Sequence, residues 1–148
     1  MRLEPLYHAT FTTPEAWSVT LRASGGSEGQ SFLIAEGTVS GRVNARYRAA
    51  NFPRRRVDGA LVPDFRGVLE TYDGATILFS WNGLATPTGS GMRRLAGSLT
   101  HLTDDERYAW LNDTVCALTG EVRPRPEGEG FEVILEVAEL VWEPVAQV

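Results

Sequence analysis

The chain has 148 residues, of which 43% are hydrophobic and 22% are charged, and its formal net charge is −5 at pH 7. This length and composition predict one globular domain over residues 1–148 that is large enough to bury its own core. The acidic balance argues against nucleic acid or an anionic membrane as the main partner.

Runs of β-branched and aromatic residues recur along almost the whole chain. They predict strands at residues 3–11, 17–23, 31–40 and 42–49, then a central hairpin, then strands at 92–102, 114–123 and 131–142. Glycine, proline and serine cluster in the turns between these runs. About eight short strands without intervening helical patterns predict an all-β fold, either an antiparallel sandwich or a closed antiparallel β-barrel.

The central hairpin, residues 63–83, carries the strongest local signal, because Asp73-Gly74 separates two β-rich runs. A two-residue turn at this dipeptide places Arg66 opposite Trp81 on the facing strand. Side chains alternate along a strand, so Asp64 is expected on the same face as Arg66. The apolar residues predicted on that face are Ile77, Phe79 and Trp81. Such a face is typical of a ligand pocket with a polar anchor at one end.

Only one segment carries helical signals. Thr103 and Glu106 form a capping box, and the following run 107–112 predicts a short helix of about two turns. Tyr108 of this helix is a candidate contact to a substrate, and core packing is the alternative explanation of its aromatic ring.

Cysteine and histidine usage limits the chemistry. Cys116 is the single cysteine, so no intrachain disulfide is possible and nothing favours an oxidising compartment. The first residues lack the apolar run of a signal peptide, and no run is long enough to span a membrane, so a cytoplasmic protein is expected. His8 and His101 show no metal-ligand spacing with Cys116. We therefore expect no metal and no cofactor.

Asp64 and Arg66 are the first candidate pair for catalysis. Arg66 is expected to stabilise a developing oxyanion on a carbonyl compound, and Asp64 is expected to move a proton. A structural ion pair at the rim of the barrel is the alternative.

Glu36 and Arg46 are the second candidate pair. Glu36 interrupts the apolar run 32–39, and an inward position would raise its pKa toward that of a general acid. An outward position on a half-exposed strand is the alternative. His101 is a candidate proton carrier at the end of its strand, with a surface or core position as the alternative. Tyr47 is expected to line the lumen.

Short motifs along the chain also resemble those of a known family. In chain order they lie at residues 36–42, 58–59, 64–66, 69–75, 82–83 and 107–112. They resemble a bacterial family catalogued as domain-of-unknown-function family 3237. This resemblance implies an antiparallel barrel similar to allene oxide cyclase and other calycin-like barrels, with an apolar lumen and often a dimer, and no established reaction. The family pattern has an aromatic residue where this chain has Gly67, which predicts extra room beside Arg66.

These features predict a cofactor-independent enzyme of secondary metabolism or catabolism. An isomerase, cyclase or lyase acting on a small apolar or aromatic carbonyl compound in the lumen is expected. One alternative is a non-catalytic binding protein for a small hydrophobic ligand. A second is a structural interaction protein whose lumen is filled by Trp81, Phe79 and Tyr47. Apolar residues on the second face of the hairpin lead us to expect a homodimer.

Overall fold

A computed structural model describes residues 1–147 as an all-β protein with one short helix. The elements are β1 (Arg2–Ala23), β2 (Gly26–Gly41), β3 (Ala45–Asn51), β4 (Arg54–Arg55), β5 (Leu61–Val62), β6 (Asp64–Thr71), β7 (Thr76–Pro87), β8 (Arg93–Leu102), the 3₁₀ helix η1 (Glu106–Asp113), β9 (Val115–Pro124) and β10 (Phe131–Val141). Among residues 1–147, no helix is long and apolar enough to cross a membrane.

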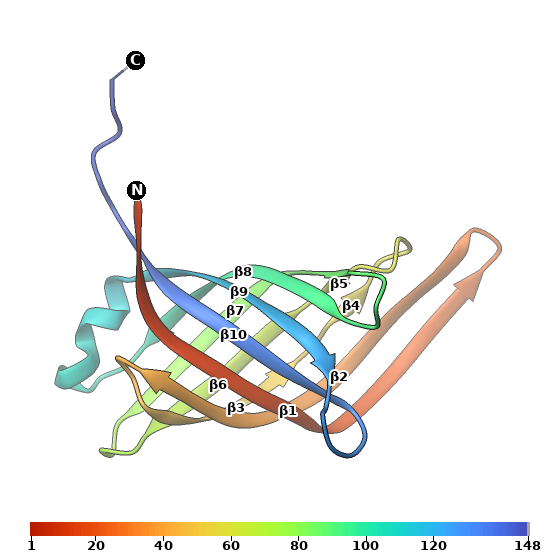
Figure 1. The fold of residues 1–148 in the computed structure, drawn as a ribbon, viewed down its shortest axis with the longest axis horizontal. Helices are drawn as coiled ribbons and strands as arrows, with labels where there is room; N and C mark the ends of the chain where they lie inside the picture. The colour runs from red at the N-terminus through yellow and green to blue at the C-terminus, as the bar shows by residue number, and fades with distance from the viewer. Residues whose placement is uncertain (148) are drawn as a thin grey trace.

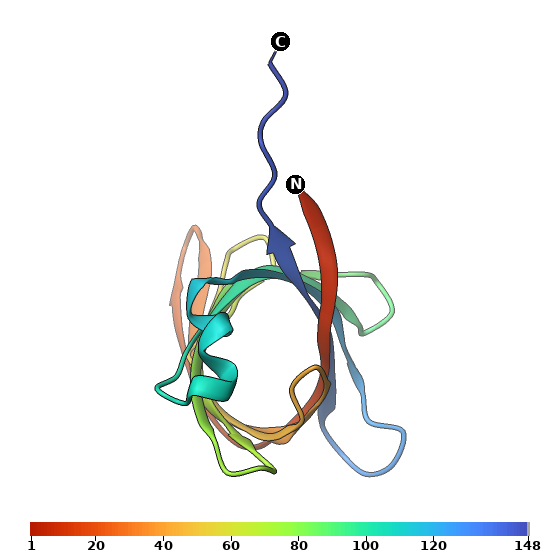
Figure 2. The same cartoon turned by 90° about the vertical axis from the view of Figure 1, so that its left-hand side faces the viewer.

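Eight of the strands form a closed antiparallel ring (Figures 1 and 2). The hydrogen-bonded order is β1-β10-β9-β8-β7-β6-β3-β2, and pairing of β2 with β1 closes the ring. The two-residue strands β4 and β5, which the sequence did not predict, connect β2 to β7 at one end. Helix η1 lies at the opposite end, as Figure 1 shows. The closed ring confirms the expected all-β antiparallel barrel with one short helix.

Alternation of inward and outward side chains along the ring strands builds most of the core. In β3, Ala45, Tyr47 and Ala49 are buried while Arg46 and Arg48 are exposed. A period of two also holds along much of β6, β7 and β8, so these strands place apolar side chains in the lumen at alternate positions. The core therefore lies inside the ring.

Strand β1 is a single strand where the sequence predicted two. The pairing register with β2 shifts between Thr12 and Glu15, and Pro14 lies within this irregularity. Proline has no N–H to donate and is tolerated at such a bulge. Beyond it, residues 15–23 of β1 pair with residues 26–34 of β2 and project from the ring as a two-stranded extension, here called the arm (Figure 1).

The β6–β7 hairpin differs by one residue from the predicted register. Thr71 N donates to Ala75 O at 2.9 Å, so the loop has three residues, 72–74, instead of two. Gly74 has a φ of +95°, as the last residue of a three-residue hairpin loop requires. Thr71 Oγ1 accepts from Ala75 N at 2.7 Å and donates to Asp73 Oδ1 at 2.6 Å. These contacts stabilise the longer loop.

The changed register reverses the two faces of β6. Phe65 lies opposite Trp81, and Arg66 lies opposite Ser80. Because neighbouring side chains point to opposite faces, a shift of one residue moves every side chain of a strand to the other face. Asp64 and Arg66 are therefore exposed on the outside of the ring. The prediction that Arg66 faces Trp81 is wrong.

The short helix also differs from its prediction. Glu106–Asp113 is a 3₁₀ helix, and its N-cap is Asp105, whose side chain accepts from Arg107 N at 2.9 Å. The predicted N-cap, Thr103, instead donates from Oγ1 to Thr76 O at 2.7 Å. Thr103 thus anchors the segment before the helix to the start of β7.

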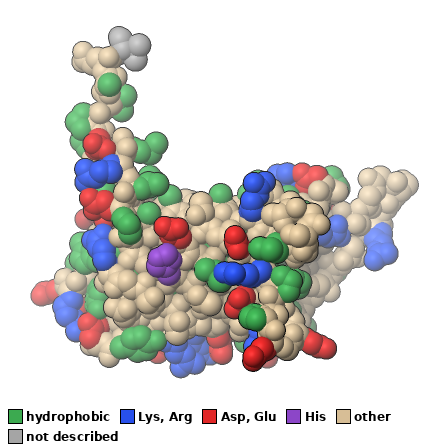
Figure 3. Space-filling model, in the orientation of Figure 1, with side chains coloured by type: hydrophobic (Ala, Val, Ile, Leu, Met, Phe, Trp, Pro, Cys, Tyr) green, Lys and Arg blue, Asp and Glu red, His purple; other side chains and the backbone are tan. Residues whose placement is uncertain are grey.

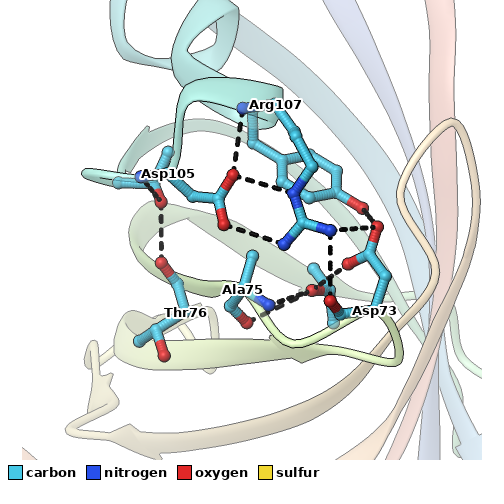
Figure 4. A network of polar contacts seen from close by, with 8 residues as sticks. Asp73, Ala75, Thr76, Asp105 and Arg107 are labelled. Atoms are coloured by element: carbon cyan, nitrogen blue, oxygen red, sulfur yellow. Dashed lines mark hydrogen bonds and ion pairs between the residues drawn. The ribbon is translucent and has the colours of Figure 1, made fainter.

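A polar network fastens η1 to the β6–β7 loop (Figure 4). The Arg107 guanidinium donates to both carboxylate oxygens of Asp105, at 3.0 and 2.9 Å, and its Nη1 donates to Asp73 O at 3.1 Å. Tyr108 Oη donates to Asp73 Oδ2 at 2.7 Å. Leu111 of the helix is fully buried against the core. We call these contacts the latch, because they hold η1 across one end of the ring.

The extra room expected at Gly67 does not exist. A Cβ placed on Gly67 would lie 2.6 Å from Phe79 Cζ and 2.3 Å from Arg48 O. Phe79 is the cross-strand partner of Gly67, and its ring covers the position where a side chain is missing.

We therefore expect Gly67→Ala to destabilise the fold by roughly 1–3 kcal/mol, because the added methyl forces Phe79 and the neighbouring strand apart. Urea unfolding followed by tryptophan fluorescence measures this difference. Gly25→Ala is the matched control, since a Cβ at Gly25 meets nothing within 4 Å. Equal unfolding free energies for the two variants would contradict this packing account.

Candidate functional site

Four aromatic residues, one each from β1, β3, β6 and β7, fill the middle of the lumen. Phe65 stacks on Trp81 with ring centroids 4.1 Å apart, and Phe11 stacks on Tyr47 at 4.6 Å. Trp81 Nε1 donates to Tyr47 Oη at 3.2 Å, which satisfies both polar groups in the core. We call Phe11, Tyr47, Phe65 and Trp81 the aromatic plug. Between the plug and η1 the lumen is packed with further apolar side chains, including Phe79 and Ile77.

On the other side of the plug the lumen is open and forms a cavity of about 580 Å³. Phe11, Phe65 and Trp81 of the plug form its floor. Its walls are mostly apolar and include Leu33, Leu61, Leu95, Phe131 and Val133. The cavity therefore lies at the end of the ring that carries the arm, opposite the latch.

Few polar side chains line this cavity. Asn51 is buried, and its Oδ1 accepts from Asp64 N at 3.0 Å; its NH₂ group adds hydrogen-bond donors. Arg93 donates from Nη1 to Gly59 O at 2.8 Å, and within residues 1–147 no carboxylate lies within ion-pairing distance of it. Thr13 adds a hydroxyl. The cavity thus offers hydrogen-bond donors and one positive charge, with no carboxylate or imidazole in its lining.

A second polar pair lies inside the ring. Tyr7 Oη and His101 Nε2 are joined by a hydrogen bond of 2.8 Å, and both residues are buried. Burial lowers the pKa of His101 to about 4 and holds that of Tyr7 well above its usual range. Both are therefore neutral near pH 7. His101 Nδ1 is buried and has no partner among the described residues.

The outer face of the ring carries a broader groove of about 670 Å³ over β1 and β7–β10. Its lining mixes the basic side chains of Arg94 and Arg123 with the acidic ones of Glu121 and Glu136. Arg123 Nε lies 3.9 Å from the Glu121 carboxylate. Figure 3 shows acidic and basic side chains side by side on this face. Because these charges compensate one another in an open groove, we favour the lumen cavity as the functional site.

The structure places five of the candidate residues inside the ring. They are Tyr47, Ile77, Phe79, Trp81 and His101. Of these, Trp81 alone contacts the cavity; the others lie deeper, in the plug or between the plug and η1. The apolar wall expected from β7 therefore exists, but most of it is core packing.

The charged candidates and Tyr108 lie elsewhere. Asp64 and Arg66 lie outside the ring because of the register shift. The carboxylate of Glu36 is 3.6 Å from Arg48 Nη2 on the outer face, so its partner is not the expected Arg46, which is exposed beside it. The phenol of Tyr108 is engaged in the latch, as described above. None of these five side chains lines the cavity. The prediction that Asp64, Arg66 and Glu36 act inside the lumen is therefore wrong.

Sequence reasoning missed the two donors of the cavity. Arg93 has a detectable signal, since alternation along the predicted strand 92–102 puts it on the face of Leu95 and Leu99. Asn51 has the same signal at the end of its strand, where it follows Tyr47 and Ala49 on the inward face.

Comparison with known proteins supports the architecture. A sequence model of the family described as "Protein of unknown function (DUF3237)" matches residues 1–140. A β-barrel-like protein of Acinetobacter baumannii is 21% identical, with a TM-score of 0.74, covering 93% of this chain and 94% of its own. A protein of unknown function from Clostridium acetobutylicum is 21% identical, with a TM-score of 0.73 and coverage of 94% and 96%.

A third solved structure of the same fold is described as an enzyme. This protein, from Penicillium herquei, is 20% identical to the chain, with a TM-score of 0.63 and coverage of 92% and 93%. No curated protein matches the chain. At these identities the structural similarities establish the fold alone.

The buried imidazole of His101 makes stability depend on pH. Its pKa of about 4 in the folded protein lies below the ordinary value of 6.5. Between these values the unfolded chain binds a proton that the folded protein does not. We expect the free energy of unfolding to fall as the pH drops through this window, by up to about 3 kcal/mol from His101.

Urea unfolding across this pH range tests the expectation. His101→Gln should flatten the dependence, because glutamine does not titrate. His8→Gln is the matched control, since it makes the same replacement at an exposed position on β1. An unaltered slope in His101→Gln would show that another group is responsible.

Proposed function

The chain belongs to the DUF3237 family of proteins of unknown function, and we propose that it binds a small, largely apolar or aromatic compound that carries a carbonyl or carboxylate group. The observation that carries this proposal is an apolar cavity containing Arg93, which has no carboxylate partner among the described residues. A half-buried arginine without a counter-ion favours an anionic or strongly polarised oxygen. The apolar walls favour a hydrocarbon body.

Size and shape support the same ligand class. A cavity of about 580 Å³ is in the range of small-molecule sites. Phe11, Phe65 and Trp81 present aromatic surface at the floor, where a planar ligand can pack. The NH₂ group of Asn51 supplies a second donor near this surface. A ligand with one polar end and one aromatic end would satisfy both parts of the cavity.

We expect Arg93→Met to weaken the binding of 2-naphthoate by roughly 10–100-fold, since one hydrogen-bonded charge pair contributes about 1.5–3 kcal/mol. Binding of the uncharged 2-methylnaphthalene should change little. Isothermal titration calorimetry measures both. Arg66→Met is the matched control, because it removes the same charge from the outer face. Equal affinity of 2-naphthoate for wild type and Arg93→Met would refute the anchor role.

A second candidate function is cofactor-independent turnover of such a compound by isomerisation, cyclisation or elimination. The donors of Arg93 and Asn51 favour it, because donors fixed in an apolar cavity stabilise an oxyanion that develops during reaction. The cavity lining holds no carboxylate or imidazole to act as a general base. Reactions driven by ligand shape and oxyanion stabilisation therefore suit the site better than those needing proton abstraction by the protein.

Turnover and binding are distinguished by following a molecule that co-purifies with the protein. Mass spectrometry and NMR after long incubation should show a rearranged product if the site is catalytic. In that case Arg93→Met should lower the rate by about 10²–10³-fold. Recovery of the molecule chemically unchanged would leave binding as the function.

A further inference from the structure

The arm has a strand edge without a partner. Pairing of β1 with β10 ends at Thr12 opposite Glu132, whereas pairing of β1 with β2 continues to Ala23 opposite Gly26. The outer edge of residues 13–23 therefore pairs with no strand in the described part of the chain. This edge lies along the arm that projects from the ring in Figure 1. Its free N–H and C=O groups are a template for another strand.

The middle of this edge lacks the usual protection against pairing. Natural edge strands are protected by charged residues, proline or bulges. Here Pro14 and Glu15 lie at the root of the arm and Arg22 lies near its tip, but residues 17–21 read Trp-Ser-Val-Thr-Leu, without charge or proline. Trp17, Val19 and Thr20 of this stretch have high β propensity.

One face of the arm is also apolar and exposed. Trp17, Val19 and Leu21 share this face and are 56%, 75% and 72% exposed. Phe32 lies beside Trp17 with ring centroids 5.6 Å apart, and Phe52 lies 5.2 Å from Phe32. Contiguous apolar surface of this kind on a projecting element marks an interaction site.

We propose that a second copy of the chain pairs with this edge in antiparallel fashion, about a twofold axis at Val19. The sequence around Val19 is symmetric in character, with hydroxyl residues at 18 and 20 and large apolar residues at 17 and 21. A twofold axis between Val19 and Val19 of the partner subunit sets Trp17 opposite Leu21 of the partner subunit and Ser18 opposite Thr20 of the partner subunit. Each face of the arm thus continues across the axis with matching chemistry.

The area available fits a modest dimer. The exposed parts of Trp17, Val19, Leu21 and Phe32 amount to roughly 400 Å² per copy, taking 150–250 Å² for a whole aromatic side chain. A standard interface buries about 800 Å² per partner. Backbone pairing along residues 15–23 supplies part of the remainder. The interface therefore lies at the lower end of stable assemblies, and a dissociation constant of about micromolar is expected.

This interface is distinct from the ligand site. Ala16 and Leu33 of the arm line the cavity, and they lie on the opposite face from Trp17 and Phe32. Dimer formation through the edge leaves the cavity lining unchanged. Failure of ligand binding and failure of dimerisation would therefore be separate results.

Sedimentation equilibrium at micromolar concentrations tests the proposal. The wild-type chain should form a dimer, and Val19→Glu should raise the dissociation constant by roughly tenfold or more, because like charges meet across the axis. Leu102→Glu is the matched control, since Leu102 is 64% exposed on the outer face of β8. A monomeric wild type, or an unchanged dimer in Val19→Glu, would overturn the proposal.

Cross-linking gives an independent readout. Val19→Cys places two thiols opposite each other at the axis, within the distance that a disulfide spans. Mild oxidation should convert this variant to a covalent dimer and leave Leu102→Cys monomeric. The native Cys116 is fully buried and does not interfere. Equal formation of covalent dimer by Val19→Cys and Leu102→Cys would contradict the pairing about Val19. A different strand would then be the occupant of this edge.

Discussion

The three-residue loop of the β6–β7 hairpin decides what lies inside this protein. A two-residue turn and a three-residue loop differ by one residue in register, and one residue reverses the faces of the strand. With the loop at 72–74, Phe65 enters the lumen and stacks on Trp81. Arg66 then faces solvent. The aromatic plug, and therefore the floor of the cavity, depends on this choice.

The same loop also closes one end of the ring. Asp73 accepts from Thr71 within the loop and from Tyr108 of η1. One carboxylate therefore stabilises the three-residue loop that sets the strand register and also takes part in the latch. Helix η1 then places Leu111 against the core. The latch leaves the other end of the ring as the open one. The polar contacts of the latch lie at the end occupied by η1, whereas the cavity at the open end is lined mostly by apolar side chains, with Thr13, Asn51 and Arg93 as its polar ones.

Strand β1 contributes to both the proposed ligand cavity and the proposed dimer interface. Its first half belongs to the ring, and its Phe11 side chain forms part of the plug. After the irregularity at Pro14 the strand continues into the arm, whose inner face lines the cavity and whose outer edge is free. One strand therefore carries a ligand-facing surface and a surface for a partner. The bulge separates them by changing the pairing neighbours of β1.

Sequence alone determined the fold class and most of the strands, because period-two alternation and turn residues are local signals that survive without knowledge of the partners. It also identified Trp81, Phe79 and Tyr47 as lumen residues. It did not determine that Asp64 and Arg66 face outward, since that depends on a hydrogen bond from the Thr71 hydroxyl that selects one loop length over another. It did not identify Asn51 and Arg93 as cavity donors either. Those two side chains come from β3 and β8, which do not pair with each other. They line one cavity because the sheet curves into a ring, and that curvature is a property of the tertiary structure.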